Sequence, residues 1–361
     1  MTEIGFHEDD LSRLKRYLER PQGILLVTGP TGSGKSTLLY SALRYIQHET
    51  KNIVTVEDPV EYQMVGINQV QVDEKAKKTF PSALRAILRQ DPDVIMIGEI
   101  RDKETAQIAF RASVTGHLVL TTVHTNDAAS AVTRLIDLGL EPFMVASSLL
   151  GVVSMRLVRT LCPRCTEPYE APASNLNRLG ATLPEGGSVT LHRGRGCAHC
   201  HETGYLGRTG IFETLEVNEN IRGLIVANSP DSAIRQAAVE GGMRSIGEDG
   251  LRKVMNGLTT LEEITRVVYL AEQPMKVCTG CRNVVNKEFE YCPLCGEFVG
   301  EHCESCKRRL EPSWTFCPHC GEDAAGSDEA TPVNGHTKPE PVTVVRPRSR
   351  RVSVAPQRKA S

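Results

Sequence analysis

A glycine-rich loop carries the clearest chemical pattern in this chain of 361 residues. Residues 29–36 read GPTGSGKS, which fits the phosphate-binding pattern GxxxxGK[ST]. Glycines let successive backbone N–H groups face a phosphate, and the helix after Lys35 presents its positive end to the same anion. The Lys35 ammonium adds a charge at the β- and γ-phosphates, and the Ser36 hydroxyl suits Mg²⁺. We therefore expect a nucleotide site formed by Gly29, Pro30, Thr31, Gly32, Ser33, Gly34, Lys35, Ser36 and Thr37.

Three polar clusters follow the next three apolar segments. They are EDPVE at 57–61, GEIRD at 98–102 and TTVHTN at 121–126, and His117 precedes the last segment. In an open parallel sheet, ligands bind at the carboxyl ends of the strands. Acids there can hold the water ligands of a metal or orient an attacking water, and a histidine or asparagine can contact the γ-phosphate. One such cluster is often an ordinary solvated loop, but three after a phosphate loop predict a shared site.

The elements around these residues predict an α/β domain. Short apolar runs indicate buried strands at 24–27, 53–56, 94–97 and 118–121. Helices are expected at 37–47, 80–90 and 105–112, and Leu11, Leu14 and Leu18 share one helical face. Apolar strands that alternate with amphipathic helices are typical of a parallel sheet covered on both faces.

Twelve cysteines form six CxxC pairs, which in a cytosolic chain favour zinc over disulfides. In the first module, 31 residues separate the pair Cys162 and Cys165 from the pair Cys197 and Cys200. Two such pairs can supply a tetrahedral zinc site, and four free or redox-active thiols are the alternative. His199 and His201 are expected to be bystanders.

A second cysteine-rich region contains a repeat that resembles a double zinc ribbon. Its cysteines are Cys278, Cys281, Cys292 and Cys295, followed 25 positions later by Cys303, Cys306, Cys317 and Cys320. Each copy is too short to build a core, so metal must supply much of its folding free energy. Four thiolates leave no open metal position, so we expect no catalytic role. Aromatic residues before the second pairs either pack on the metal loops or form a docking surface.

Composition and charge argue against some classes of function and favour others. The formal net charge is −2, and because residues 326–361 carry +4, residues 1–325 carry −6. A mildly acidic folded region argues against a general nucleic-acid binder. The sequence contains no apolar run of about 18 to 20 residues, and its acidic start is unlike a signal peptide, so we expect a cytoplasmic protein. The Pro-, Ser- and Arg-rich tail at 326–361 predicts disorder.

The phosphate loop and the three clusters together resemble a known family. GPTGSGKST, VTVEDPVEY, RQDPDVIMIGEIRD and TGHLVLTTVHTND resemble the Walker A, Asp-box, Walker B and His-box motifs of secretion ATPases of the GspE/PilB type, over roughly residues 5 to 272. The resemblance implies a RecA-like P-loop NTPase fold and Mg²⁺-dependent ATP hydrolysis. It implies that Glu99 is the Walker B acid, that Glu61 is the Asp-box acid, and that His124 and His117 are the His-box residues. The sequence leaves open which glutamate is the general base.

The resemblance also implies a biological setting. The first cysteine module and residues 204–213 match the secretion and pilus-assembly branch of the family. Its members are expected to form homo-hexamers at the inner face of the cytoplasmic membrane, where they act on a platform protein to assemble pilins or pseudopilins. They also carry a preceding domain that supplies arginines to the ATP site. Here the phosphate loop begins at Gly29, so we expect that domain to be absent, and we expect some of Arg85, Arg89, Arg101 and Arg111 to compensate between subunits.

We expect five regions. They are an ATPase core at 1–160, a tetracysteine zinc insertion at 161–204, a helical C-terminal region of the ATPase at 205–273, a double zinc ribbon at 274–325 and a basic tail at 326–361. Two alternatives to a motor remain open. The chain could be a nucleotide-binding adaptor that recruits a protein through its ribbons, or a nucleic-acid translocase.

Overall fold

A computed structural model describes most of the first three quarters of the chain. The described residues are 4–73, 75–173, 176, 187–268, 275–277, 284–286, 291, 296–297, 299, 305–306, 308 and 316–321. The chain divides into two compact units, Met1–Ala271 and Glu272–Ser361, and each is considered by itself.

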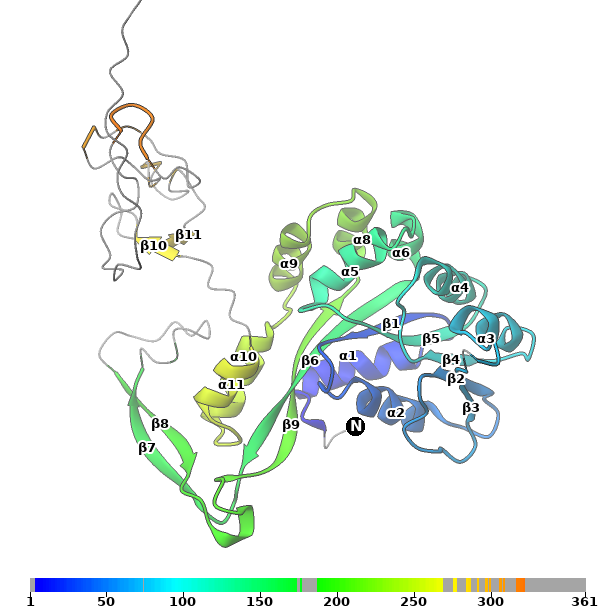
Figure 1. Ribbon diagram of the computed structural model, residues 1–361, viewed down its shortest axis with the longest axis horizontal. Helices are drawn as coiled ribbons and strands as arrows, with labels where there is room; N and C mark the ends of the chain where they lie inside the picture. The colour runs from blue at the N-terminus through cyan, green and yellow to red at the C-terminus, as the bar shows by residue number, and fades with distance from the viewer. Residues whose placement is uncertain are drawn as a thin grey trace, which may run out of the picture. The chain divides into compact units, whose positions relative to one another are not determined.

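The first unit is built on a seven-stranded sheet with the strand order β3-β2-β4-β5-β1-β6-β9 (Figure 1). Neighbouring strands are parallel except at one edge, where β9 runs antiparallel to β6. The strands are β1 (Gly23–Thr28), β2 (Ile53–Glu57), β3 (Asn68–Gln71), β4 (Val94–Ile97), β5 (Leu118–Val123), β6 (Leu149–Leu161) and β9 (Tyr205–Glu216). The parallel order places the carboxyl ends of β1, β2, β4 and β5 at the same edge.

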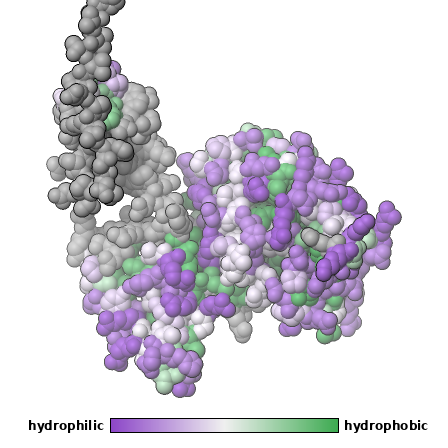
Figure 2. All heavy atoms as spheres, viewed as in Figure 1, coloured by the Kyte–Doolittle hydropathy of each residue, from purple (hydrophilic) through white to green (hydrophobic). Residues whose placement is uncertain are grey.

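Helices cover both faces of this sheet. Alternate residues of each strand point to opposite sides, so each face presents apolar side chains that a helical layer can bury. Leu25 and Val27 of β1 pack with helices α1 (Glu8–Leu18) and α2 (Lys35–Ile46). Ile24 and Leu26 belong to the core cluster on the other face. That cluster includes residues of α3 (Phe80–Ile87), α4 (Lys103–Val114), α5 (Ala128–Asp137), α6 (Pro142–Ser148), α8 (Glu219–Val226) and α9 (Asp231–Glu240). Hydrophilic side chains occupy most of the visible face of this unit (Figure 2).

The long strands β6 and β9 extend beyond the main sheet and carry the cysteine insertion. Between them lie the antiparallel pair β7 (Thr166–Pro172) and β8 (Ser188–Gly194) and a short 3₁₀ helix, Ala198–Cys200. Helices α10 (Ile246–Met255) and α11 (Leu261–Val267) pack here through a separate apolar cluster that joins Val158, Leu191, Ile211, Val254 and Ile264. The insertion is therefore anchored to the nucleotide domain through continuous strands and its own small core.

The second unit is described only in part. Strands β10 (Met275–Val277) and β11 (Val284–Asn286) form an antiparallel pair. Five of the predicted zinc ligands lie outside the described residues, as does the tail at 326–361. They are Cys278, Cys281, Cys292, Cys295 and Cys303.

The expected parallel sheet and its two helical layers are confirmed, with four predicted strands extended by at most two residues. Three further strands of the sheet were not predicted, namely β3, β6 and β9. Within the region 205–273, the first residues form β9, and the helices expected from about Asn218 begin at Glu219. Within the described part of the chain, no helix has both the length and the apolar character needed to cross a membrane.

Candidate active site and metal centre

The phosphate loop connects β1 to α2, and its glycines adopt backbone conformations that other residues avoid. Gly29 and Gly34 have φ angles of 146° and 95°. A Cβ atom at Gly29 would lie 2.5 Å from the Met155 carbonyl oxygen on β6, so the loop can curl against that strand only with glycine at this position. Helix α2 begins directly after Gly34 without a side-chain cap, which leaves its first N–H groups available to an anion.

Two side chains of this loop fit a bound phosphate. The Lys35 ammonium is buried and donates to the carbonyl oxygens of Gly29 and Pro30, at 2.8 and 3.0 Å. Burial lowers the pKa of Lys35, while nearby Glu99 opposes that change. The Ser33 hydroxyl is buried and has no hydrogen-bond partner among the described residues. Such an orphaned donor is expected where a ligand supplies the acceptor.

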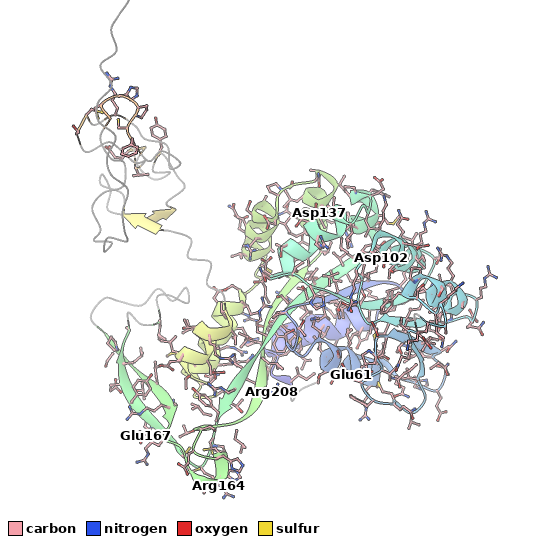
Figure 3. All side chains as sticks on the ribbon, viewed as in Figure 1. Glu61, Asp102, Asp137, Arg164, Glu167 and Arg208 are labelled. Carbon is pink, nitrogen blue, oxygen red and sulfur yellow. The ribbon has the colours of Figure 1, made fainter. Side chains whose placement is uncertain are left out.

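A cavity of about 590 Å³ opens over the loop, a size typical of ligand sites. It brings together the residues that were predicted from three separate clusters. Besides the phosphate loop from Thr31 to Thr37, its lining includes Tyr40, Glu57, Asp58, Glu61, Glu99, His124 and Arg208. Glu61 comes from the loop after β2 and Arg208 from β9 (Figure 3).

Glu99 follows β4 and lies between two basic side chains. Its carboxylate forms an ion pair with Arg101 on one side and approaches His124 Nε2 at 3.2 Å on the other. The Glu99 side chain is only 13% exposed, whereas those of Arg101 and His124 are 65% and 48% exposed. The acid is therefore held in place, while its partners reach solvent and can rearrange around a nucleotide.

Glu57 and Glu61 have different environments although four positions separate them. Glu57 is buried and accepts hydrogen bonds from Tyr40, from the Thr55 hydroxyl at 2.6 Å and from the Gln69 amide at 3.2 Å. Burial and the bond to Glu57 raise the pKa of Tyr40. The Glu61 side chain is exposed, and its backbone N–H donates to the Tyr40 hydroxyl at 3.3 Å. Glu57 is thus held by three donors, whereas Glu61 is an exposed acid among the residues that line the cavity.

The two histidines implied by the resemblance lie at opposite ends of β5. His124 follows the strand, and the next residue is tied to β1 because the Thr125 N–H donates to Thr28 Oγ1 at 2.9 Å. His117 precedes the strand, where its Nδ1 lies 2.9 Å from the Ala112 carbonyl oxygen. His117 is not among the residues that line the cavity. Only His124 is therefore brought to the candidate site of this chain.

Among the described residues, one arginine lines the cavity, whereas the four expected arginines concern contacts between subunits. Arg85 pairs with Glu104, and neither Arg89 nor Arg111 lines the cavity. Arg208 does, yet sequence reasoning did not single it out. Its only signal was its place in the segment GYLGRTG at 204–210, which the resemblance already included.

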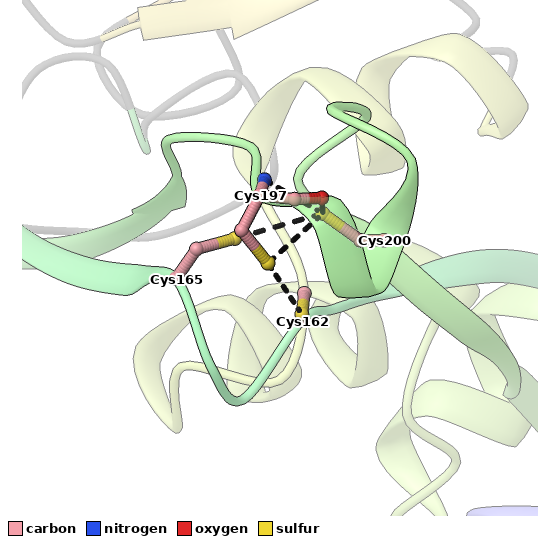
Figure 4. A group of neighbouring side chains, drawn as sticks. All are labelled: Cys162, Cys165, Cys197 and Cys200. Carbon is pink, nitrogen blue, oxygen red and sulfur yellow. Dashed lines mark hydrogen bonds between the residues drawn. The ribbon is translucent and has the colours of Figure 1, made fainter.

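The first four cysteines form a compact cluster (Figure 4). The Cys162–Cys197, Cys165–Cys200 and Cys197–Cys200 sulfur distances are 3.9, 3.8 and 3.7 Å. A tetrahedral zinc site with Zn–S bonds of about 2.3 Å places its sulfurs about 3.8 Å apart. A disulfide would need about 2.05 Å. The geometry therefore fits zinc and does not fit a pair of disulfides, and neither His199 nor His201 joins the cluster.

Backbone amides prepare this cluster for a metal. The N–H groups of Cys197 and Gly204 donate to Cys200 Sγ at 3.2 and 3.3 Å. Although burial opposes them, these donors lower the pKa of Cys200 to about 6 and favour the thiolate that binds zinc. Burial raises the pKa of Cys165 to about 12, which a bound cation would reverse.

A second cluster of cysteine side chains lies in the second unit. Cys306, Cys317 and Cys320 have their sulfur atoms within 4.8 Å of one another, and Cys306 Sγ lies 3.6 Å from Cys317 Sγ. The predicted fourth ligand, Cys303, is outside the described residues. The three described ligands agree with the spacing of a zinc ribbon.

A phosphate loop after the first strand, a parallel sheet and acids at neighbouring strand ends define a P-loop nucleotide-binding protein. Comparison with protein families agrees with this class. Residues 1–266 match the family described as type II/IV secretion system protein, and residues 278–321 match the double zinc ribbon family. Because the first match covers more than half of the sequence, the chain belongs to the type II/IV secretion system protein family.

Named relatives extend the comparison. The chain is 52% identical over 267 residues to type II secretion system protein E of Pseudomonas aeruginosa, covering 74% of this chain and 53% of that one. It is 50% identical over 264 residues to the type IV pilus assembly ATPase PilB of Thermus thermophilus, covering 73% of this chain and 30% of PilB. The crystal structure of the pilus retraction motor PilT with bound ADP has a TM-score of 0.54 and 32% identity, covering 74% of this chain and 66% of that one. The chain thus spans about half the length, or less, of the curated relatives it matches.

Proposed function

We propose that this chain binds ATP with Mg²⁺ and hydrolyses it to ADP and phosphate. The observation that carries the proposal is the single cavity that unites the phosphate loop with Glu61, Glu99 and His124. These side chains follow three different strands, so their convergence is a property of the sheet order and not of local sequence. The names of relatives that are ATPases support the same activity.

Each residue has a physical task in this proposal. The loop N–H groups and Lys35 hold the phosphates, and Lys35 must exchange its present carbonyl partners for phosphate oxygens. Ser36 and Glu99 are the oxygen donors suited to Mg²⁺, which would neutralise charge on the β- and γ-phosphates when bound. Glu61 presents a carboxylate that can orient or deprotonate the attacking water, and His124 is placed to contact the γ-phosphate. We infer that Glu61 is the better candidate for the base, because Glu99 is already paired on both sides.

We further propose that the ATPase powers assembly of pilins or pseudopilins. The support is the presence of both a type II secretion protein and a pilus assembly ATPase among relatives at least 50% identical over the matched region. In this proposal the chain acts as a homo-hexamer on a membrane platform protein at the inner face of the cytoplasmic membrane. We also propose three bound zinc ions per chain and the five regions outlined from the sequence, with β6 and β9 linking the first three into one unit.

Phosphate release tests the chemical part of this proposal. We expect wild-type chain to release phosphate from ATP in the presence of Mg²⁺, whereas Lys35→Ala loses the activity because the buried ammonium is removed. Glu104→Gln is a matched control, because this exposed carboxylate pairs with Arg85 outside the cavity. Equal phosphate release by wild type and Lys35→Ala would refute the proposed ATPase activity.

The double zinc ribbon match favours a second candidate, a nucleotide-binding adaptor that recruits a protein partner. Light scattering separates the two functions. A motor is expected to increase in mass when ATP is added, because its hydrolysis cycle requires neighbouring subunits. A chain that binds ATP, stays monomeric and releases no phosphate would support the adaptor and exclude the motor.

A further inference from the structure

The segment after β5, residues 124–128, carries His124 and is held by a different element at almost every position. Thr125 is bonded to β1, since its hydroxyl lies 2.7 Å from Thr28 Oγ1 and its N–H donates to the same oxygen. We call residues 124–128 the His124 loop. Its remaining contacts come from β6, β9 and α9, and they are made by charged side chains.

Arg156 of β6 contacts the His124 loop and lies next to Gly29 of the phosphate loop. It is only 8% exposed, and its Nη2 atom donates to the Asn126 carbonyl oxygen at 2.5 Å. Its Nη1 atom donates to the Met155 carbonyl oxygen at 3.1 Å and would lie 3.3 Å from a Cβ at Gly29. The buried guanidinium therefore ties the His124 loop to β6 at a point next to the phosphate loop.

Glu213 of β9 supplies the opposite charge beneath the same loop. It is 2% exposed, and its Oε1 atom accepts from the Ala128 N–H at 2.8 Å. Ala128 is the first residue of α5, so the carboxylate lies at the positive end of that helix. Burial raises the pKa of Glu213, while the Ala128 amide and Arg235 oppose that change.

Asp127 is a residue of the His124 loop itself and connects this loop to the C-terminal helices. One of its oxygens caps α5 by accepting from the Ser130 N–H at 2.8 Å. The other lies 2.8 Å from the guanidinium of Arg235, a residue of α9. Arg156, Glu213 and Arg235 therefore contact the loop from three different elements, and the Arg235–Asp127 pair is the contact that joins it to a separate helix.

We propose that Arg235 is a positioning residue for the proposed ATPase reaction: through Asp127 it fixes the start of α5 and thereby holds His124 opposite Glu99. This inference rests on the proposed function, because it assigns Arg235 an effect on turnover. A purely stabilising ion pair is the competing explanation. At 38% exposure for Arg235 and 21% for Asp127, such a pair alone contributes little to stability, so the two explanations predict different kinetics.

A double-mutant cycle with His124 separates these explanations. We expect Arg235→Gln to lower kcat by about tenfold with about the same KM for ATP, and Arg235→Lys to retain most of the activity. In a His124→Ala background, Arg235→Gln should cause no further loss. Arg222→Gln is the matched control, because the ion pair that this arginine of α8 forms among the described residues is with Glu219, three positions earlier in the same helix. Losses that simply multiply in the double variant would overturn the proposal.

Hydrogen exchange tests the positioning without relying on activity. In Arg235→Gln, the amides of Thr125 and Ala128 should exchange faster than in wild type, while amides of the phosphate loop at 29–36 keep their rates. Equal exchange of the His124 loop in Arg235→Gln and Arg222→Gln would overturn the proposal. If wild-type chain releases no more phosphate than Lys35→Ala, the proposed function fails, and the exchange result still decides whether Arg235 holds the loop.

Discussion

The hydroxyl of Tyr40 joins the helix after the phosphate loop to both glutamates that follow β2. It donates to the buried Glu57 carboxylate and accepts from the Glu61 N–H. Tyr40→Phe removes that hydroxyl and leaves Glu57 with two donors, the Thr55 hydroxyl and the Gln69 amide. Because a buried hydrogen bond to a carboxylate contributes about 1.5–3 kcal/mol, we expect the free energy of unfolding to fall by about 2 kcal/mol.

Tyr45 offers a control on the same helix. Its hydroxyl donates to Glu19 at 2.8 Å, but the residue is 41% exposed. Tyr45→Phe should therefore lower the free energy of unfolding much less than Tyr40→Phe. Urea unfolding followed by far-ultraviolet circular dichroism is the suitable assay.

The Tyr40 variant also has a functional consequence. Without the hydroxyl, the Glu61 backbone loses its anchor, so we expect kcat for phosphate release to fall while ATP binding through the phosphate loop persists. Stability losses for Tyr40→Phe and Tyr45→Phe that agree to within about 0.5 kcal/mol would refute the reasoning, because the burial of Glu57 would then carry no energetic weight.

Two further predictions concern the region around the cysteine insertion. Burial alone would raise the pKa of Glu263, but Arg266 and Arg159 hold this pKa at about 2. The stabilisation that ionised Glu263 provides is therefore complete above pH about 4.5 and is lost as the pH falls toward 2. Glu263→Gln should lower the free energy of unfolding by about 2 kcal/mol at pH 7, an amount that allows for its half-exposed arginine partners. Urea unfolding should show a smaller difference between wild type and variant at pH 3. An equal difference at pH 7 and pH 3 would contradict this prediction. Cys162→Ser should remove one zinc ion per chain in metal analysis and destabilise the insertion, whereas His199→Ala should keep the full zinc content. Zinc loss in both variants would show that the ligand set is wrong.

The strands that sequence predicted share one property. β1, β2, β4 and β5 are buried on both faces, so each appears as a short run of mostly apolar residues. β3 could not be found in this way, because it is an edge strand of four polar or half-exposed residues. β9 mixes exposed and buried residues, and its pairing with β6 spans the whole cysteine insertion. Local periodicity does not contain that long-range contact.

The residues of the candidate site also divide into those that the sequence predicts and those that only the fold brings together. The phosphate loop, Glu99 and Glu61 belong to contiguous patterns with a known chemical meaning, and the cavity is lined by loop residues 31–37 together with both glutamates. Arg208 comes from β9, so only the sheet topology brings it to the cavity. Arg156 and Glu213 were also missed, since a sequence does not show that two charged residues are buried beside one another. Charge pairs of this kind depend on packing between strands far apart in the chain.

The central claim is that one cavity both binds ATP and hydrolyses it, with separate residues for the two tasks. The most direct test measures ATP binding and phosphate release on the same samples of wild type, Lys35→Ala and Glu99→Gln. We predict that wild type binds and hydrolyses ATP, that Lys35→Ala does neither, and that Glu99→Gln binds ATP but releases phosphate at least about a hundredfold more slowly. Wild-type release no faster than that of either variant would contradict the account.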